Sequence, residues 1–310
     1  MSSQNPKKYW LSESESKSKI SLGVLAYAAG DAFGVQFEFG PKITGEIVHQ
    51  LVEKTGWPVG GVSDDTLLSI LTIKALHSPT AEAAKVRFLD SMRDTLPQLR
   101  GLGPTTRAAL GLPVKEVELS QVGYSNGGMM RTALMGFAFP TSNVELRREW
   151  IGALVSATHT FPKALDCAQI LAAGFSASVE TSAIHAVLVA IRREAETNPS
   201  ISPETKTAIA SWESWVPPEI GVSNDSLETL LAVMFVISRA TNTRDAYSIA
   251  CTLGGDTDTV AALAGSLYAS TYCDADAFFA IEWIEEVDWI GIEDLSTAIA
   301  ILIERRSHVA

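Results

Sequence analysis

Two acidic clusters, far apart in the chain, hold the side chains best suited to chemistry. The first is Ser63-Asp64-Asp65-Thr66, and the second is Gly254-Gly255-Asp256-Thr257-Asp258-Thr259. Carboxylates cost several kcal/mol to bury unless a partner compensates their charge, and hard divalent cations prefer oxygen ligands. Neither cluster contains Cys or His, so magnesium or manganese fits better than zinc. The clusters therefore predict one composite metal site with oxygen ligands, built from two distant segments.

Helix capping is the simpler explanation for an acidic residue at a loop-to-helix transition. Pro58 and Gly60-Gly61 precede the first cluster, and Gly254-Gly255 precedes the second, so both clusters are predicted to open helices. Ser63 and Asp64 are suitable N-cap or first-turn residues. Capping uses only part of each cluster, however, and the metal site remains the favoured interpretation.

A further carboxylate follows the first helical segment. The stretch 30–34, Gly-Asp-Ala-Phe-Gly, is expected to end that helix with a glycine C-cap and a solvated turn. Glu38 then lies among Val35, Phe37 and Phe39. A glutamate in apolar surroundings has a raised pKa and can act as an acid or base.

The stretch 125–131, Ser-Asn-Gly-Gly-Met-Met-Arg, is a glycine pair at the opening of a helix. Backbone N–H groups at such a place can bind phosphate oxygens, although the Gly-Lys-Ser/Thr ending of a Walker loop is missing. Tyr124 could stack on a base, with core packing as its alternative. His159 follows Thr158, and a single histidine near a helix end is usually structural. No Ser-His-Asp or Cys-His arrangement can be argued from the other histidines.

Length and composition predict one soluble globular domain. The chain has 310 residues, of which 46% are hydrophobic and 19% are charged. A site built from both acidic clusters requires the two ends of the chain to pack together. The net charge of −12 argues against a nucleic-acid-binding surface, but it allows a nucleotide ligand whose charge a metal neutralises.

The cysteines and the N-terminal segment indicate a cytoplasmic protein. Cys167, Cys251 and Cys273 show no CxxC spacing, which favours free thiols in a reducing compartment. The polar segment 1–19 lacks the apolar region of a signal peptide, and no apolar run is long enough to span a membrane. Without a coiled-coil heptad, a monomer is expected.

Helical periodicity dominates the chain from residue 18 onward, whereas alternating strand patterns are scarce. We therefore expect an all-α fold, with residues 1–17 as a flexible tail and 18–310 as a single compact multi-helix domain. The expected helices are 18–30, 64–77, 81–93, 128–138, 144–157, 164–177, 181–195, 226–239, 244–253, 257–270, 276–285 and 294–304.

Taken in order, the motifs at 30–38, 63–66, 126–131, 158–159 and 254–260 resemble those of the ADP-ribosylglycohydrolase family. That family includes the dinitrogenase-reductase-activating glycohydrolases and the ADP-ribosyl-arginine and ADP-ribosyl-serine hydrolases. Each motif is only moderately specific, but five in the right order are a strong signal. The resemblance implies an all-α fold with a binuclear magnesium or manganese site at loop–helix junctions.

The resemblance also assigns roles to individual residues. The implied metal ligands are Ser63, Asp64, Asp65, Asp256, Asp258 and Thr259, with Ser63 where many members have Thr. The implied substrate-binding residues are Tyr124, Ser125, Asn126, Gly127, Gly128, Met129 and His159. The implied catalytic residues are Glu38, Asp65 and Asp258, and the choice between Glu38 and Asp65 as general base or acid stays open.

The implied activity is metal-dependent hydrolysis of the glycosidic bond at the distal ribose of ADP-ribosylated proteins, with arginine-linked ADP-ribose expected first. Serine-linked or free ADP-ribose derivatives are an alternative, as is a non-catalytic ADP-ribose-binding or structural member. Class I terpenoid synthases also use Asp-rich motifs in all-α folds. Their first motif needs an Asp where this chain has Leu68, and 224–226, Asn-Asp-Ser, matches their second motif only in part.

Overall fold

The fold is helical throughout the part of the chain that the structure describes. The structure is a computed structural model, and it describes residues 14–54, 57–99, 101–115 and 122–309. Within these ranges β-pairing is limited to isolated bridges, which confirms the predicted all-α class. The α-helices are α1 (Glu15–Gly34), α2 (Asp64–Lys74), α3 (Ala81–Asp94), α4 (Pro104–Ala109), α5 (Gly127–Ala133), α6 (Val144–Val155), α7 (Pro162–Ser178), α8 (Ile184–Thr197), α9 (Pro203–Ala210), α10 (Ser226–Arg239), α11 (Thr243–Thr252), α12 (Thr257–Tyr272), α13 (Ala275–Phe279) and α14 (Leu295–Val309).

Short 3-10 helices extend or connect several of these elements. They are η2 (Ala75–His77), η3 (Leu96–Gln98), η5 (Leu134–Ala138), η6 (Trp212–Ser214) and η7 (Ile284–Glu286). The expected helix 276–285 is two short pieces, α13 and η7. Helices α4 and α9 were not expected. Both begin with a proline and are too short for a helical period to be visible in the sequence.

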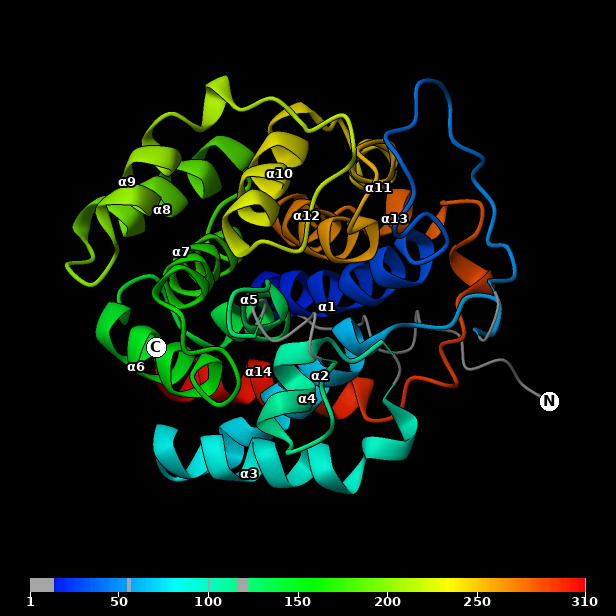
Figure 1. The fold of residues 1–310 in the computed structure, drawn as a ribbon. Coiled ribbons are helices and arrows are strands. Elements are labelled where there is room, and N and C mark those ends of the chain that lie inside the picture. Colours follow the sequence, from blue (N-terminus) through cyan, green and yellow to red (C-terminus); the bar gives the residue numbers. More distant parts are fainter. Residues whose placement is uncertain (1–13, 55–56, 100, 116–121, 310) are drawn as a thin grey trace.

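Helices α1 and α12 form the centre of the molecule and pack along each other (Figure 1). Every residue of α1 from Lys19 to Gly34 is buried, and α12 is buried from Thr257 to Thr271. A helix that is apolar on all sides requires neighbours on all sides. These two helices therefore form the scaffold on which the other elements, including both acidic clusters, are placed.

Glycines on α1 allow its backbone to approach α12 closely. A Cβ atom at Gly30 would lie 2.6 Å from the carbonyl oxygen of Ala261, and one at Gly34 would lie 2.5 Å from the Cα of Asp258. Neither separation is compatible with a side chain. The C-terminal end of α1 is thereby held against the first turn of α12, where the second acidic cluster begins.

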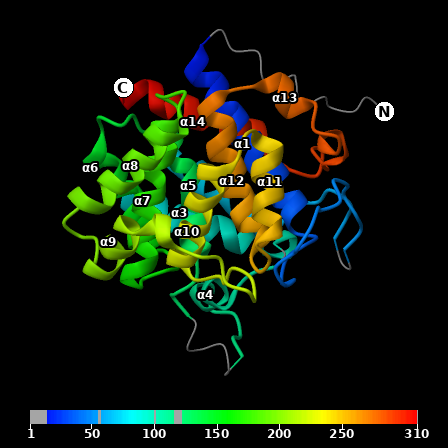
Figure 2. The same ribbon diagram turned by 90° about the horizontal axis from the view of Figure 1, so that it is seen from above.

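A second group of helices gathers around α7. Helices α5, α6 and α8 and the 3-10 helix η5 all contact α7, and α9 continues from α8 at the edge of the molecule (Figures 1 and 2). Helix α10 connects the two groups, since it contacts both α7 and α12. The N-terminal ends of α5 and α12 therefore belong to the two groups that meet at the candidate site.

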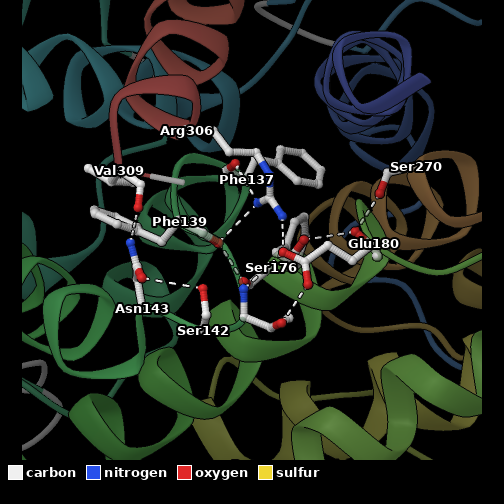
Figure 3. Close-up of polar contacts among 12 residues, drawn as sticks. Phe137, Phe139, Ser142, Asn143, Ser176, Glu180, Ser270, Arg306 and Val309 are labelled. Atoms are coloured by element: carbon white, nitrogen blue, oxygen red, sulfur yellow. Dashed lines mark hydrogen bonds and ion pairs between the residues drawn. The ribbon is translucent and has the colours of Figure 1, made fainter. Parts of the chain in front are cut away.

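The C-terminal helix is attached through Arg306, whose side chain is almost fully buried. Its Nη1 donates to the carbonyl oxygens of Phe137 and Phe139, each at 3.0 Å, and its Nη2 pairs with Glu180. Figure 3 shows the guanidinium pointing at these acceptors. One side chain thus joins α14 to η5 and to the end of α7.

The remaining structural expectations have mixed outcomes. Helix α1 begins at Glu15, so its start lies inside the segment that was expected to be a flexible tail, and residues 1–13 lie outside the described part of the chain. The cysteines are unpaired, as predicted. None of the described helices combines the length and the apolar character that crossing a bilayer requires.

Candidate active site

The first acidic cluster opens helix α2. Ser63 is the N-cap residue, and its hydroxyl accepts a hydrogen bond from the backbone N–H of Asp65 at 3.1 Å. This leaves Asp64 and Asp65 in the first turn, where the helix dipole favours negative charge. Capping therefore accounts for the side chain of Ser63 but not for the two carboxylates behind it.

Asp31, which the sequence analysis did not select, ties α1 to this turn. Its carboxylate accepts from the backbone N–H groups of Ser63 and Thr66, both at 3.0 Å, and from the Thr66 hydroxyl at 2.6 Å. The stretch 30–34 ends the helix as expected, but the C-cap residue is Val35, so the expected glycine C-cap and solvated turn are wrong. The helix continues to Gly34, and Asp31 is fully buried within it.

The second acidic cluster follows a glycine turn that two other segments hold in place. Gly254 and Gly255 adopt φ values of +69° and +76°, which favour glycine. Gly255 donates to the Gly40 carbonyl and accepts from the N–H of Phe39, both at 2.8 Å. Asp256 donates its N–H to the carbonyl of Val222 at 2.9 Å. These bonds place Asp256 and Asp258 at the start of α12, opposite the start of α2.

The carboxylates of both clusters and of Glu38 converge on one cavity. It has a volume of about 420 Å³, and Glu38, Asp64, Asp65, Asp256, Asp258 and Thr259 are among its lining residues. Carboxylate oxygens of Glu38, Asp256 and Asp258 lie within 4.8 Å of one another. The Oδ2 atom of Asp65 and the Oδ1 atom of Asp258 are buried and have no hydrogen-bond donor among the described residues. Acceptor atoms without donors in an all-oxygen cluster fit a hard divalent cation.

The electrostatics of the cluster agree with that fit. Burial is the first cause that raises the pKa of Asp65 and of Asp258 well above the ordinary value, and the charges of neighbouring aspartates add to it. Burial and the charge of Asp31 raise the pKa of Asp64 to about 8. Without a cation these groups resist ionisation together, and a bound cation would reverse that preference.

Glu38 lies at the edge of the cluster and has its own partner. Lys54 donates from Nζ to Glu38 Oε2 at 2.9 Å and to the carbonyl oxygen of Val35 at 2.6 Å. Burial raises the pKa of Glu38, and Lys54 opposes that shift. The expectation of a glutamate with a raised pKa is therefore supported, and Lys54 is a neighbour that the sequence did not indicate.

The Ser125–Gly127 loop also lines the cavity. Asn126 is the N-cap residue of α5, and its Nδ2 donates to the hydroxyl of Thr229 at 2.9 Å and to the carboxylate of Asp256. Its backbone N–H donates to the carbonyl of Asn224 at 2.8 Å. The amide side chain therefore connects the loop to the acidic cluster.

His159 lies behind this loop and is fully buried. Its Nε2 atom is 2.9 Å from the hydroxyl of Ser125, and its Nδ1 atom is 2.7 Å from the hydroxyl of Thr158. A Cβ at Gly128 would lie 3.1 Å from the imidazole, so the glycine allows the close approach of the ring. Tyr124 is partly exposed next to the loop and packs on Phe161, with ring centroids 3.7 Å apart.

Most of the residues predicted from sequence meet at this cavity. The lining includes Glu38, Asp64, Asp65, Ser125, Asn126, Gly127, Asp256, Asp258 and Thr259. The other predicted residues, Ser63, Tyr124, Gly128, Met129 and His159, are outside that lining. Met129 is fully buried in the hydrophobic core. Their roles in binding stay predictions.

Two further segments line the cavity and were missed. One is the turn of Gly101, Gly103 and Pro104 with Thr106 of α4, and the other is 222–224, Val-Ser-Asn. The first has a recognisable signal, because a Gly/Pro-rich turn before a helix is typical of binding loops. The second is irregular chain that pairs with the Gly254–Gly255 turn, and only the three-dimensional structure brings it there.

Comparison with known proteins shows the family of the chain. The model of the family described as ADP-ribosylglycohydrolase matches residues 12–308. The chain belongs to the ADP-ribosylglycohydrolase family. It is 26% identical over 287 residues, 86% of this chain and 73% of the relative, to the ADP-ribosylarginine hydrolase Tri1 of Pseudomonas putida (strain GB-1). It is also 26% identical over 236 residues to the uncharacterized protein YegU of Escherichia coli (strain K12), covering 67% of this chain and 69% of the relative.

The fold agrees as well. A solved structure described as an ADP-ribosylglycohydrolase-related protein complex superposes with a TM-score of 0.69 at 22% identity, over 94% of this chain and 99% of that one. Family and fold together identify the protein as a hydrolase of ADP-ribose linkages. The family match also excludes the terpenoid-synthase alternative, which rested on a partial motif.

Proposed function

We propose that the protein removes ADP-ribose from modified protein side chains by hydrolysing the glycosidic bond at the distal ribose, with arginine-linked ADP-ribose as its first substrate. The observation that carries this proposal is the convergence of acidic residues from α2 and α12 (the acidic wall) on a cavity that the Ser125–Gly127 loop also lines. The acidic wall has the groups for a divalent cation, and the loop has hydroxyl, amide and backbone groups for a polar ligand.

The acidic wall would hold two divalent cations, magnesium or manganese. Asp64 and Asp65 would bind them from α2, and Asp256, Asp258 and Thr259 from α12, with the Ser63 hydroxyl next to them. The donor-free oxygens of Asp65 and Asp258 support this assignment. When bound, such cations supply Lewis-acid chemistry, which orients the ribose hydroxyls, lowers the pKa of water and stabilises developing charge.

The chain's own residues would position the ligand and move protons. Asn126 joins the substrate loop to Asp256 and so fixes the loop against the acidic cluster. Glu38 and Asp65 are the carboxylates for proton transfer. Burial raises the pKa of Glu38, as a general acid or base near neutral pH requires. An oxocarbenium-like transition state is expected, as in other glycoside hydrolysis.

Arginine linkage is supported by the activity named for the Pseudomonas relative and by the acidity of the cavity. A guanidinium leaving group carries positive charge, which a carboxylate such as Glu38 attracts. This charge match supports arginine-linked ADP-ribose as the first substrate.

Release of ADP-ribose from an ADP-ribosyl-arginine protein tests the proposal. The assay has arms with magnesium, with manganese and with a chelator, and a serine-linked substrate runs in parallel. We expect cation-dependent release from the arginine-linked substrate. Release from the serine-linked substrate alone would show that the enzyme cleaves the serine linkage and not the arginine linkage. Tight ADP-ribose binding without turnover of either substrate would favour a binding protein.

Two substitutions separate cation binding from proton transfer. We expect Asp65→Asn to lose cation binding and turnover together, because it removes a donor-free oxygen from the cluster. We expect Glu38→Gln to keep cation binding but to lower kcat about 10²- to 10⁴-fold, the usual contribution of a general acid or base. Calorimetric cation titration and steady-state kinetics measure both. Full turnover in Asp65→Asn contradicts the composite site, and an unchanged rate in Glu38→Gln removes Glu38 from the mechanism.

A further inference from the structure

A chain of hydrogen bonds runs from a buried arginine to the wall of the cavity. Arg131 donates from Nη2 to the hydroxyl of Thr158 at 2.8 Å. That hydroxyl is 2.7 Å from His159 Nδ1, and His159 Nε2 is 2.9 Å from the hydroxyl of Ser125. Arg131, Thr158 and His159 are all buried, and only Ser125 lines the cavity.

The Arg131 guanidinium indicates which atom donates and which accepts in each of these hydrogen bonds. A guanidinium has only donors, so the oxygen of Thr158 accepts from Arg131. The Thr158 hydroxyl still has its own proton, and His159 Nδ1 is the acceptor in reach. If Nδ1 accepts, the neutral imidazole carries its proton on Nε2.

The Nε2 proton then points at Ser125. The Ser125 oxygen accepts it, which leaves the Ser125 hydroxyl proton as the group available to the cavity. A serine hydroxyl without a fixed partner can rotate and act as donor or acceptor. Because the Ser125 oxygen accepts from His159, its hydroxyl faces the ligand as a donor, which suits a phosphate or ribose oxygen.

We propose that Arg131 and Thr158 are positioning residues, which hold His159 as its Nε2–H tautomer and so make Ser125 a hydrogen-bond donor to an acceptor oxygen of the ligand. The tautomer follows from the hydrogen bonds alone. The identity of the ligand as ADP-ribose rests on the proposed function.

The surroundings of His159 support a fixed rather than a reactive imidazole. Burial, aided by the positive charge of Arg131, lowers the pKa of His159 to about 3, so the ring stays neutral. Both ring nitrogens are occupied by hydroxyls. His159 therefore acts through Ser125 and is not a proton-transfer group.

Arg131 is itself held firmly in place. Its Nη2 also donates to the carbonyl oxygen of Leu154 at 2.8 Å, and its guanidinium lies over the ring of Phe88, 4.3 Å from the centroid. Within the described part of the chain, its Nη1 is buried without an acceptor. A buried donor without a partner destabilises a fold. A role in orienting Thr158 explains why an arginine is present here despite that loss of stability.

Nitrogen NMR of the protein labelled with ¹⁵N-histidine tests the tautomer without any ligand. His159 is assigned by comparison with His159→Gln. We expect the Nε2 resonance of a protonated nitrogen and the Nδ1 resonance of an unprotonated one. A proton on Nδ1, or an even mixture of the two tautomers, would overturn the inference.

Thr158→Val tests the positioning role, since valine keeps the shape and removes the hydroxyl. We expect the fixed tautomer to be lost and the affinity for ADP-ribose to fall about threefold, while Ser125→Ala lowers that affinity about tenfold, the range of one hydrogen bond. Thr158→Ser should restore both properties. Thr271→Val is the matched control. Thr271 is also fully buried, and among the described residues its hydroxyl donates only to the carbonyl oxygen of Leu267 in its own helix. Unchanged His159 resonances and affinity in a folded Thr158→Val would overturn the proposal.

The two readouts separate this inference from the proposed function. A fixed Nε2–H tautomer that depends on Thr158, in a protein that does not bind ADP-ribose, would keep the positioning role and overturn both the ligand and the hydrolase proposal. ADP-ribose binding that Thr158→Val and Ser125→Ala leave unchanged would keep the proposed function and overturn the donor role.

Discussion

At the scale of residues, Lys54 is the neighbour that decides where the Glu38 carboxylate lies. Its ammonium bridges Glu38 and the carbonyl oxygen of Val35, and its side chain is only 28% exposed. We expect Lys54→Met to release Glu38 and to lower kcat about tenfold with little change in KM, because positioning acts on the reacting geometry. Steady-state kinetics on the arginine-linked substrate measure kcat and KM separately.

Lys42→Met is the matched control for this prediction. Lys42 forms a similar 2.9 Å ion pair, but its partner Glu219 is 84% exposed and outside the cavity lining. Exposed pairs contribute little, so we expect wild-type kinetics. An equal loss of kcat in both variants would mean that the effect comes from the surface charge and not from Glu38.

The residues proposed to bind cations could be predicted from sequence because two acidic clusters hold more carboxylates than helix capping uses. Asp65 and Asp258 stand out in apolar surroundings, and the structure brings both to one cavity. Asp31 was missed for the opposite reason. It lies in a glycine-flanked stretch that is typical of a helix end, and only the contact of α1 with α2 shows that its carboxylate accepts from Ser63 and Thr66.

At the scale of elements, the contact between α1 and α12 positions the site. We expect Gly34→Ala to destabilise the fold by about 1–3 kcal/mol, because the new Cβ would meet α12 backbone at 2.5 Å and force the helices apart. Turnover should fall with it, since Asp258 lies at the contact. Urea unfolding and kinetics measure the two effects.

Gly152→Ala on α6 is the control for that change. The only atom near a Cβ there is the amide nitrogen of Gln169, at 3.4 Å. Alanine is the better helix former by about 1 kcal/mol, so we expect equal or greater stability. A stabilising Gly34→Ala would show that α1 and α12 can separate without cost.

The attachment of α14 gives a second prediction at this scale. We expect Arg306→Met to lower the free energy of unfolding by about 2–3 kcal/mol, because it removes charged hydrogen bonds from the carbonyls of Phe137 and Phe139 and breaks the ion pair with Glu180 (Figure 3). Arg244→Met, which breaks an exposed pair with Glu282, should cost less than about 1 kcal/mol. Equal losses in urea unfolding would contradict this account of α14.

Helix existence was predictable where an apolar period runs for several turns. The span of α10, 226–239, was predicted to the residue, and 64–77 was read as one helix where the structure has α2 followed by η2. Short elements such as α4 could not be predicted, because packing rather than periodicity determines where they form. The same holds for the division of 276–285 into α13 and η7. The Val222 segment, which supports Asp256, has no periodic signal at all.

At the scale of the whole molecule, the fold keeps buried acids whose charge either protonation or a cation can compensate, and stability should therefore depend on pH and on metal. Burial and the charge of Asp31 raise the pKa of Asp64 to about 8, and burial and neighbouring charges raise the pKa values of Asp65 and Asp258 well above the ordinary value. The folded state then binds more protons than the unfolded state above the ordinary pKa of 3.8. By linkage, the stability of the cation-free protein falls as pH rises through the raised pKa values.

Histidine acts in the opposite direction, but over a lower range. Burial lowers the pKa of His159 to about 3, so its contribution rises with pH only up to the ordinary value of 6.5. The buried thiols of Cys167 and Cys251 have pKa values raised from an ordinary 9.0, so they contribute only above that pH. The interval between about pH 7 and pH 8.5 therefore reports the acidic cluster.

We expect urea midpoints in chelator to fall between about pH 7 and pH 8.5, and saturating magnesium or manganese to raise the midpoint and remove the fall. The reason is that a bound cation favours the ionised carboxylates and so lowers their pKa values in the folded state. Asp258→Asn should flatten the profile in chelator and lose the response to cation. A steep fall that persists at saturating cation would mean that the carboxylates of α2 and α12 do not share a metal, and the composite site would have to be abandoned.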